Sequence, residues 1–323
     1  MELCGCWDQN SEDFASEGLF VTKFQDVTRG FVTFKEKKYF IKTPHSRFYK
    51  FGFVNMALSN RDNKLATTSE LISEKKYKHF NYMSAPHKAI FKPDQNEYLL
   101  RFKHKKLFGE YVLVSPILFN SDIHYASMSD FQTQENFFNK AARVDQLLFG
   151  NFENTLKNKK HFLKYMTEGC YDEYVKYLLL SLFEFSDDEH LGNVMLCKNK
   201  NVERFERLFI YDKESTAFNP FVANDLESSS LIYKTNNFSR YNGVPFFAQG
   251  ERSIERILAL TKLVADGKVP KKYCLFLNEI SNIDYEKFAR EVFEETGIVV
   301  EKKQIDMYKY GSDCAGEIFE KNV

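Results

Sequence analysis

The side chains best suited to chemistry lie in a short stretch of the second half of the chain. Residues 186–193 read Ser-Asp-Asp-Glu-His-Leu-Gly-Asn, and two apolar runs separated by a charged turn follow before Asp212. Phosphoryl transfer needs a carboxylate beside the attacking hydroxyl and divalent cations that bridge the nucleotide phosphates. Asp188 supplies such a carboxylate, and the side-chain oxygens of Asn193 and Asp212 are ligands of the kind that Mg²⁺ prefers.

The two apolar runs, 194–197 and 208–211, are expected to position these side chains. Short apolar runs on either side of a charged turn predict two paired strands. A hairpin brings its two open ends together. The pattern therefore predicts that Asn193 and Asp212, 19 residues apart in the sequence, lie close to each other.

The first third of the chain reads as strands. Alternating apolar and polar residues predict strands at 20–27, 30–34 and 38–42 and at about 97–103 and 109–118. One helix is expected among them, at about 68–83. Thr67, followed by Glu70 three residues later, has the pattern of a capping box at its start.

The sequence after residue 120 favours helices. They are predicted at about 129–148, 154–168, 171–185, 251–266 and 285–296, with glycines at 150, 169, 267 and 297 as stop signals. The helix at 171–185 is apolar on most faces, which predicts burial at the centre of a domain.

Segregated strands and helices indicate an α+β fold. We expect a strand-rich lobe at 1–118, a helical lobe at 119–323 and a ligand cleft between them.

The ordered motifs resemble those of a known kinase group. Asp188-x-His190-x-x-Asn193, followed by an apolar hairpin and Asp212, resembles the catalytic and metal-binding loops of HipA-like kinases and of the phosphatidylinositol-3-kinase superfold. The resemblance implies a bilobal protein-kinase-like fold and a Ser/Thr protein kinase that uses ATP and Mg²⁺ and is capable of autophosphorylation. It also implies that Asp188 is the catalytic residue, that His190 supports its loop, and that Asn193 and Asp212 bind metal.

The same resemblance assigns nucleotide-binding residues in the first lobe. Lys42 lies at the end of a short apolar strand that resembles the strand whose lysine reaches the α- and β-phosphates. Its partner is then a glutamate on the following helix, for which Glu74 is preferred to Glu70. The segment 110–116 resembles the hinge between the lobes, which implies that adenine binds backbone groups near Val112 and Val114.

Two departures from the kinase pattern leave the activity open. The turn at 25–30 has a single glycine and is not a glycine-rich phosphate loop, and Lys-Glu follows Asp212 where many kinases have Phe-Gly. The catalytic loop does not distinguish a protein acceptor from a lipid or a small molecule. A pseudokinase that binds nucleotide without turnover is a third possibility. Taken singly, an aspartate at a strand end is commonly a turn residue.

The composition narrows the partners and the compartment. Basic and acidic residues number 45 each, so no net charge draws the chain to nucleic acid. The six cysteines follow no disulfide spacing, which favours reduced thiols in the cytoplasm. The sequence shows no Sec signal and no apolar run of the roughly 18 residues that a membrane span needs. We expect a cytoplasmic monomer. The resemblance to HipA-like kinases implies a protein substrate and, as the other localisation, a bacterial effector carried into host cells by a non-Sec route.

Overall fold

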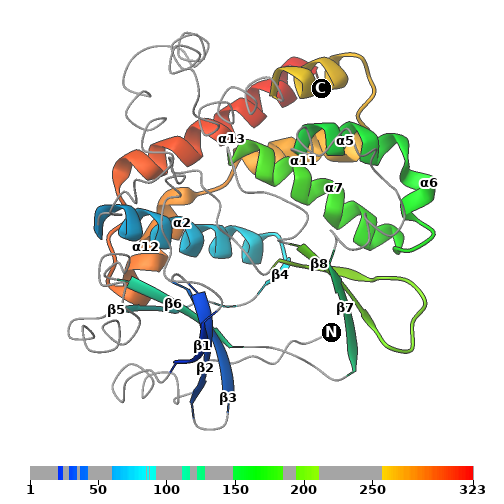
Figure 1. Cartoon of the computed structure of the whole chain (residues 1–323). Coiled ribbons are helices and arrows are strands. Elements are labelled where there is room, and N and C mark those ends of the chain that lie inside the picture. The colour runs from blue at the N-terminus through cyan, green and yellow to red at the C-terminus, as the bar shows by residue number, and fades with distance from the viewer. Residues whose placement is uncertain are drawn as a thin grey trace, which may run out of the picture.

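The protein combines two small β-sheets with a group of packed helices (Figure 1). The computed structural model describes residues 21–24, 29–34, 37–42, 60–84, 86, 88–91, 111–116, 122–127, 148–184, 194–210 and 257–322. This mixed composition agrees with the helix-and-sheet class that the sequence predicts.

The first sheet contains five antiparallel strands in the order β1-β2-β3-β6-β5. They are β1 (Val21–Phe24), β2 (Arg29–Phe34), β3 (Lys37–Lys42), β5 (Lys88–Phe91) and β6 (Tyr111–Pro116). The three N-terminal strands and the strand near 109–118 are confirmed. The strand expected at 97–103 lies outside the described residues, and β5 was not anticipated.

The second sheet holds the hairpin that the two apolar runs predict. Its order is β4-β9-β8-β7, with β4 (Met83–Ser84), β9 (Arg207–Ile210), β8 (Val194–Asn199) and β7 (Ile123–Ser127). The antiparallel pairing of β8 with β9 confirms the hairpin. The parallel pairing of β4 with β9 was not anticipated, because a two-residue strand has no periodicity to detect.

Helix α2 (Asn60–His79) lies between the first sheet and the helices α7 and α13 (Figure 1). It begins well before the predicted start near 68, so the capping box is wrong: Thr67 and Glu70 are buried inside the helix. The hydroxyl of the neighbouring Thr68 lies 3.0 Å from the carbonyl of Lys64 within the helix and 2.8 Å from the side-chain oxygen of Gln304 in α13. Buried polar side chains line much of α2: Thr67, Thr68, Ser69, Glu70, Ser73 and Lys76.

The remaining described helices form the other half of the molecule. They are α5 (Leu148–Lys157), α6 (Lys159–Phe162), α7 (Glu168–Phe183), an unlabelled helix at 257–265, α11 (Lys271–Ser281), α12 (Tyr285–Thr296) and α13 (Lys302–Asn322). The helix at 285–296 is confirmed, and Gly297 ends it with a φ of 70°. Gly267, with a φ of 67°, follows the helix at 257–265.

Two of the predicted helix ends are wrong. Gly150 lies inside α5, and Gly169 lies in the first turn of α7 and does not stop a helix before it. The signal that matters is Thr167, whose hydroxyl accepts a hydrogen bond of 3.2 Å from the amide of Cys170 and caps the start of α7. The single helix expected at 154–168 is therefore divided between α5 and α6. Most of the helix expected at 129–148 lies outside the described residues.

The burial of α7 is confirmed, and this helix lies at the centre of the main hydrophobic core. From Tyr174 to Phe183 every side chain except that of Lys176 is buried. The same core includes residues of α2, of the β8–β9 hairpin and of α11, α12 and α13. Because α2 shares this core with the C-terminal helices, the division of the chain near residue 118 stays a prediction. None of the helices that the structure describes is long and apolar enough to cross a membrane.

Candidate functional site

The open end of the β8–β9 hairpin is the described feature nearest to the predicted metal ligands. Val194 at the start of β8 pairs with Ile210 at the end of β9. Asn193 directly precedes the first of these residues, and Asp212 follows the second by two positions. Asp188, His190, Asn193 and Asp212 themselves lie outside the described residues. Their convergence stays a prediction, for which the strand register is the support.

The hairpin is fixed firmly to the core. Val194, Leu196, Leu208 and Ile210 have 0% exposure and belong to the main cluster. The amide of Leu208 also donates to the Glu173 carboxylate of α7, at 2.9 Å. Burial of several aliphatic side chains contributes about 1.5–3 kcal/mol each. The open end of the hairpin is therefore a rigid base for side chains attached to it.

The predicted nucleotide residues of the first sheet lie on neighbouring strands. Lys42 in β3 pairs with Leu113 of β6, between Val112 and Val114. Val114 also pairs with Lys88 of β5, so β6 has a strand on each side. Backbone groups of β6 therefore take part in the pairing with both neighbouring strands. The contact of adenine with Val112 and Val114 stays a prediction. The pairing does bring Lys42 and the expected hinge strand together along the backbone.

The two candidate partners of Lys42 both lie on α2. Glu70 is 1% exposed and Glu74 is half-buried. They are four residues apart and so occupy the same face of the helix. Because α2 packs against β6, which pairs with β3, both glutamates lie on an element next to the Lys42 strand. The choice of Glu74 over Glu70 stays a prediction.

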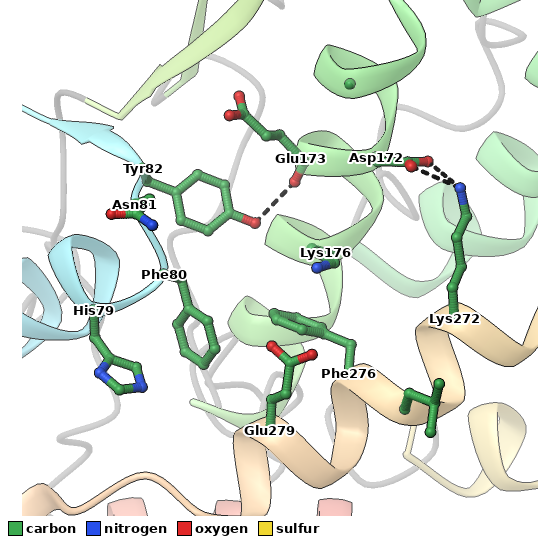
Figure 2. A pocket seen from close by; sticks show the side chains of 12 residues that line it. His79, Phe80, Asn81, Tyr82, Asp172, Glu173, Lys176, Lys272, Phe276 and Glu279 are labelled. Atoms are coloured by element: carbon green, nitrogen blue, oxygen red, sulfur yellow. Dashed lines mark hydrogen bonds and ion pairs between the residues drawn. The ribbon is translucent and has the colours of Figure 1, made fainter. Parts of the chain in front are cut away.

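A separate cavity of about 610 Å³ lies between the turn after α2, the first half of α7 and α11 (Figure 2). The rings of Phe80 and Phe276 meet at its wall, with centroids 5.1 Å apart. The ammonium of Lys176 lies 4.6 Å from the centroid of the Phe276 ring. The turn is fixed by Asn81, whose φ is 59° and whose carbonyl accepts a 2.6 Å hydrogen bond from Arg207.

The charges around this cavity are largely neutralised by neighbours. Lys272 bonds both carboxylate oxygens of Asp172 at 2.6 Å, as Figure 2 shows, and the Tyr273 hydroxyl donates to the same carboxylate at 2.7 Å. Arg207 lies 2.5 Å from Glu173. Burial raises the pKa of Glu173, and the Leu208 amide and Arg207 partly oppose this effect. Two of the carboxylates that line the recess, those of Asp172 and Glu173, therefore have cationic partners.

The cavity lies beside the beginning of β9, whereas the predicted metal ligands adjoin its end. Arg207 is the first residue of β9 and Ile210 the last. The residues around the cavity come from 79–82, 169–176 and 272–279, three separate segments without a common motif. Sequence reasoning missed it for that reason. Within the described part of the chain, no cluster of three or more His, Cys, Asp or Glu side chains is placed to hold a metal ion.

No protein-family model matches this sequence, and no curated protein matches it. Among solved structures, the chain is similar to the crystal structure of a Helicobacter pylori proinflammatory kinase, CtkA, with a TM-score of 0.48 and 10% sequence identity. The alignment covers 94% of this chain and 98% of the other. The length and the lysine- and phenylalanine-rich composition had led us to expect CtkA itself, and 10% identity does not identify the chain with it. A likeness of this strength carries no conclusion about activity.

Proposed function

We propose that the protein is an ATP- and Mg²⁺-dependent phosphotransferase that acts on Ser/Thr hydroxyls of proteins. The observation that carries the proposal is the register of the β8–β9 hairpin, which pairs Val194 with Ile210. Asn193 and Asp212 are attached to the two strands at this same end. Paired strands give two oxygen ligands from distant parts of the sequence a common position, as a nucleotide-bound cation requires.

Asp188 has a distinct role in this proposal. It belongs to the segment between α7, which ends at Phe183, and β8, which begins at Val194. The buried helix and the buried strand are both parts of one core, so the segment has rigid attachments on each side. Asp188 then orients the acceptor hydroxyl toward the γ-phosphate, and His190 supports the loop.

Lys42 provides the positive charge on the nucleotide. The pairing of β3 with β6 and the packing of α2 on β6 support a pairing of Lys42 with a glutamate of α2. A lysine oriented by a carboxylate presents its ammonium as a point charge to phosphate oxygens. Glu74 is the glutamate that we assign to this role.

The test is transfer of labelled γ-phosphate from ATP with Mg²⁺, to the protein itself and to generic protein substrates. The wild type is expected to label Ser or Thr residues. Asp188→Asn and Asp212→Ala are each expected to reduce the rate by a hundredfold or more, on the order of the loss seen when transition-state charge is no longer stabilised. Full activity of either variant would refute its assigned role.

Asp172→Asn is the matched control. It removes a partly exposed acidic side chain of α7 whose partner is Lys272 of α11. It is expected to transfer phosphate at the wild-type rate. Transfer to a lipid or a small alcohol but to no protein would favour the other acceptor classes, and nucleotide binding without any transfer would favour a pseudokinase.

A further inference from the structure

A fully buried ion pair links α2 to the end of α7. The ammonium of Lys76 contacts the carboxylate of Glu184, and the two side chains are 0% and 1% exposed. Lys76 lies in the last turn of α2, and Glu184 is the residue that caps the C-terminal end of α7. Ten other ion pairs in the described part of the chain each have at least one partner with 30% or more of its side chain exposed.

The surroundings of the pair come from three further places in the chain. The side chain of Ser73, one turn before Lys76, lies near the Glu184 carboxylate and favours its charged form. The ring of Tyr285, at the start of α12, lies near this carboxylate and stacks on Tyr308 of α13, with centroids 4.9 Å apart. Four helices therefore meet around one buried carboxylate. Lys76 and Ser73 of α2 and the nearby Tyr285 of α12 define its position, and α13 packs against Tyr285 through Tyr308.

Such a pair is a poor device for stability alone. Removing two charges from water costs free energy that their attraction repays only with good geometry, and apolar residues of similar volume often serve as well. An ion pair does fix the positions of its partners, because a charge displaced from its partner is left buried and uncompensated. The Lys76–Glu184 pair therefore favours the arrangement of α2 against α7 that keeps the two charges together.

The two elements that it joins are the ones that the proposed activity needs to align. Glu74, the assigned partner of Lys42, is two residues before Lys76 on α2. Asp188 is four residues after Glu184. A change in the relative position of α2 and the end of α7 would therefore move Glu74, the assigned partner of Lys42, relative to the segment that carries Asp188.

We propose that Lys76 and Glu184 are positioning residues, which fix α2 against the entry to the segment that carries Asp188. This inference rests on the proposed function. In this inference, the buried ion pair keeps the nucleotide-binding half of the site aligned with the catalytic half.

The experiment compares three forms of the full chain. One is the wild type, and the second is Lys76→Met/Glu184→Leu, which replaces the buried pair with apolar side chains of similar volume. The third is Lys75→Met/Glu295→Leu, which makes the same substitutions in a pair that links α2 to α12 at the surface. Urea unfolding, kcat and KM for ATP, and amide hydrogen exchange are measured for all three.

The buried double variant is expected to unfold at the wild-type urea midpoint, because no charge is left unpaired. Its kcat is expected to fall at least about tenfold, since small misplacements of reacting groups are costly, while KM for ATP changes by less than about twofold. The backbone amide of Phe80 donates to the carbonyl of Lys76, and that of Glu184 donates to the carbonyl of Leu180; both amides are expected to exchange faster than in the wild type. The surface double variant should match the wild type in all measurements.

Wild-type kcat or wild-type exchange in the buried double variant, at unchanged stability, would overturn the inference. If this variant loses stability, its kcat per folded molecule is compared with that of the wild type at matched fractions of folded protein, and a normal value again overturns the inference. Absence of phosphate transfer in the wild type would instead refute the proposed function. The exchange rates would still report whether the pair fixes α2 against α7.

Discussion

The two ends of α7 place their charges in opposite environments. At the N-terminal end, Asp172 and its partner Lys272 are 30% and 45% exposed, beside the cavity in Figure 2. At the C-terminal end, Glu184 and Lys76 are almost wholly excluded from water. Water screens the first pair, and the helix can lose it at little cost. Water does not screen the second pair, which lies where the chain enters the proposed catalytic segment.

The largest expected effect is the loss of one partner of the buried pair. Glu184→Ala leaves the Lys76 ammonium buried without a carboxylate and should lower the free energy of unfolding by about 3–5 kcal/mol. Equilibrium unfolding in urea, followed by circular dichroism, measures this. A loss below about 1 kcal/mol would show that the buried end behaves like the exposed one.

A smaller effect is expected from the equivalent change at the exposed end. Asp172→Asn removes the charge beside Lys272 but keeps an oxygen that can accept from the Tyr273 hydroxyl. The free energy of unfolding should fall by less than about 1 kcal/mol. The same urea experiment applies, and a cost equal to that of Glu184→Ala would remove the contrast between the two ends.

The smallest expected effect is a pH dependence in the first turn of α7. The hydrogen bond and the charge of Lys159 lower the pKa of the exposed Glu168 carboxylate. Because the folded-state pKa lies below the unfolded one, this carboxylate stabilises the fold above its ordinary pKa, and the contribution disappears as the pH falls through the lowered value. Thermal unfolding between about pH 3 and pH 6 should show a slightly steeper loss for the wild type than for Lys159→Met. Identical curves would contradict the assignment.

Local patterns predicted several elements correctly. The two apolar runs gave β8 and β9, and Gly297 marked the end of α12. The apolar sequence of α7 predicted its burial. In each of these elements, the residues that decide the structure are neighbours along the chain, so the pattern is visible without knowledge of the fold.

The start of α2 and its central position were not predictable in this way. Its first half is rich in polar residues, and most of it lies before the predicted start near residue 68. Thr68 is satisfied by Gln304, whose side-chain oxygen lies 2.8 Å away, and Ser69 bonds the hydroxyl of Tyr308 at 2.7 Å. These partners are more than 200 residues distant, and only the folded chain brings them together. The buried Lys76–Glu184 pair escaped sequence analysis for the same reason.

The candidate site likewise contains features that the sequence predicted and features that only the structure gives. The motifs around residues 188–212 and the resemblance to kinases nominated Lys42, Glu74, Asp188, Asn193 and Asp212. The register of the sheets adds the pairing of Lys42 with Leu113 and of Val194 with Ile210. The positions of Asp188, Asn193 and Asp212 lie outside the described residues and stay predictions. The cavity beside α7 had no sequence signal, because three distant segments form it.

The most direct test is the binding of Mn²⁺, a paramagnetic substitute for Mg²⁺, in the presence of ATP. Electron paramagnetic resonance titration should show a cation bound with the nucleotide to the wild type and to Asp172→Asn. Asn193→Ala and Asp212→Ala should each weaken this binding by about tenfold or more. Unchanged Mn²⁺ affinity in both variants would contradict the convergence of Asn193 and Asp212 on one cation.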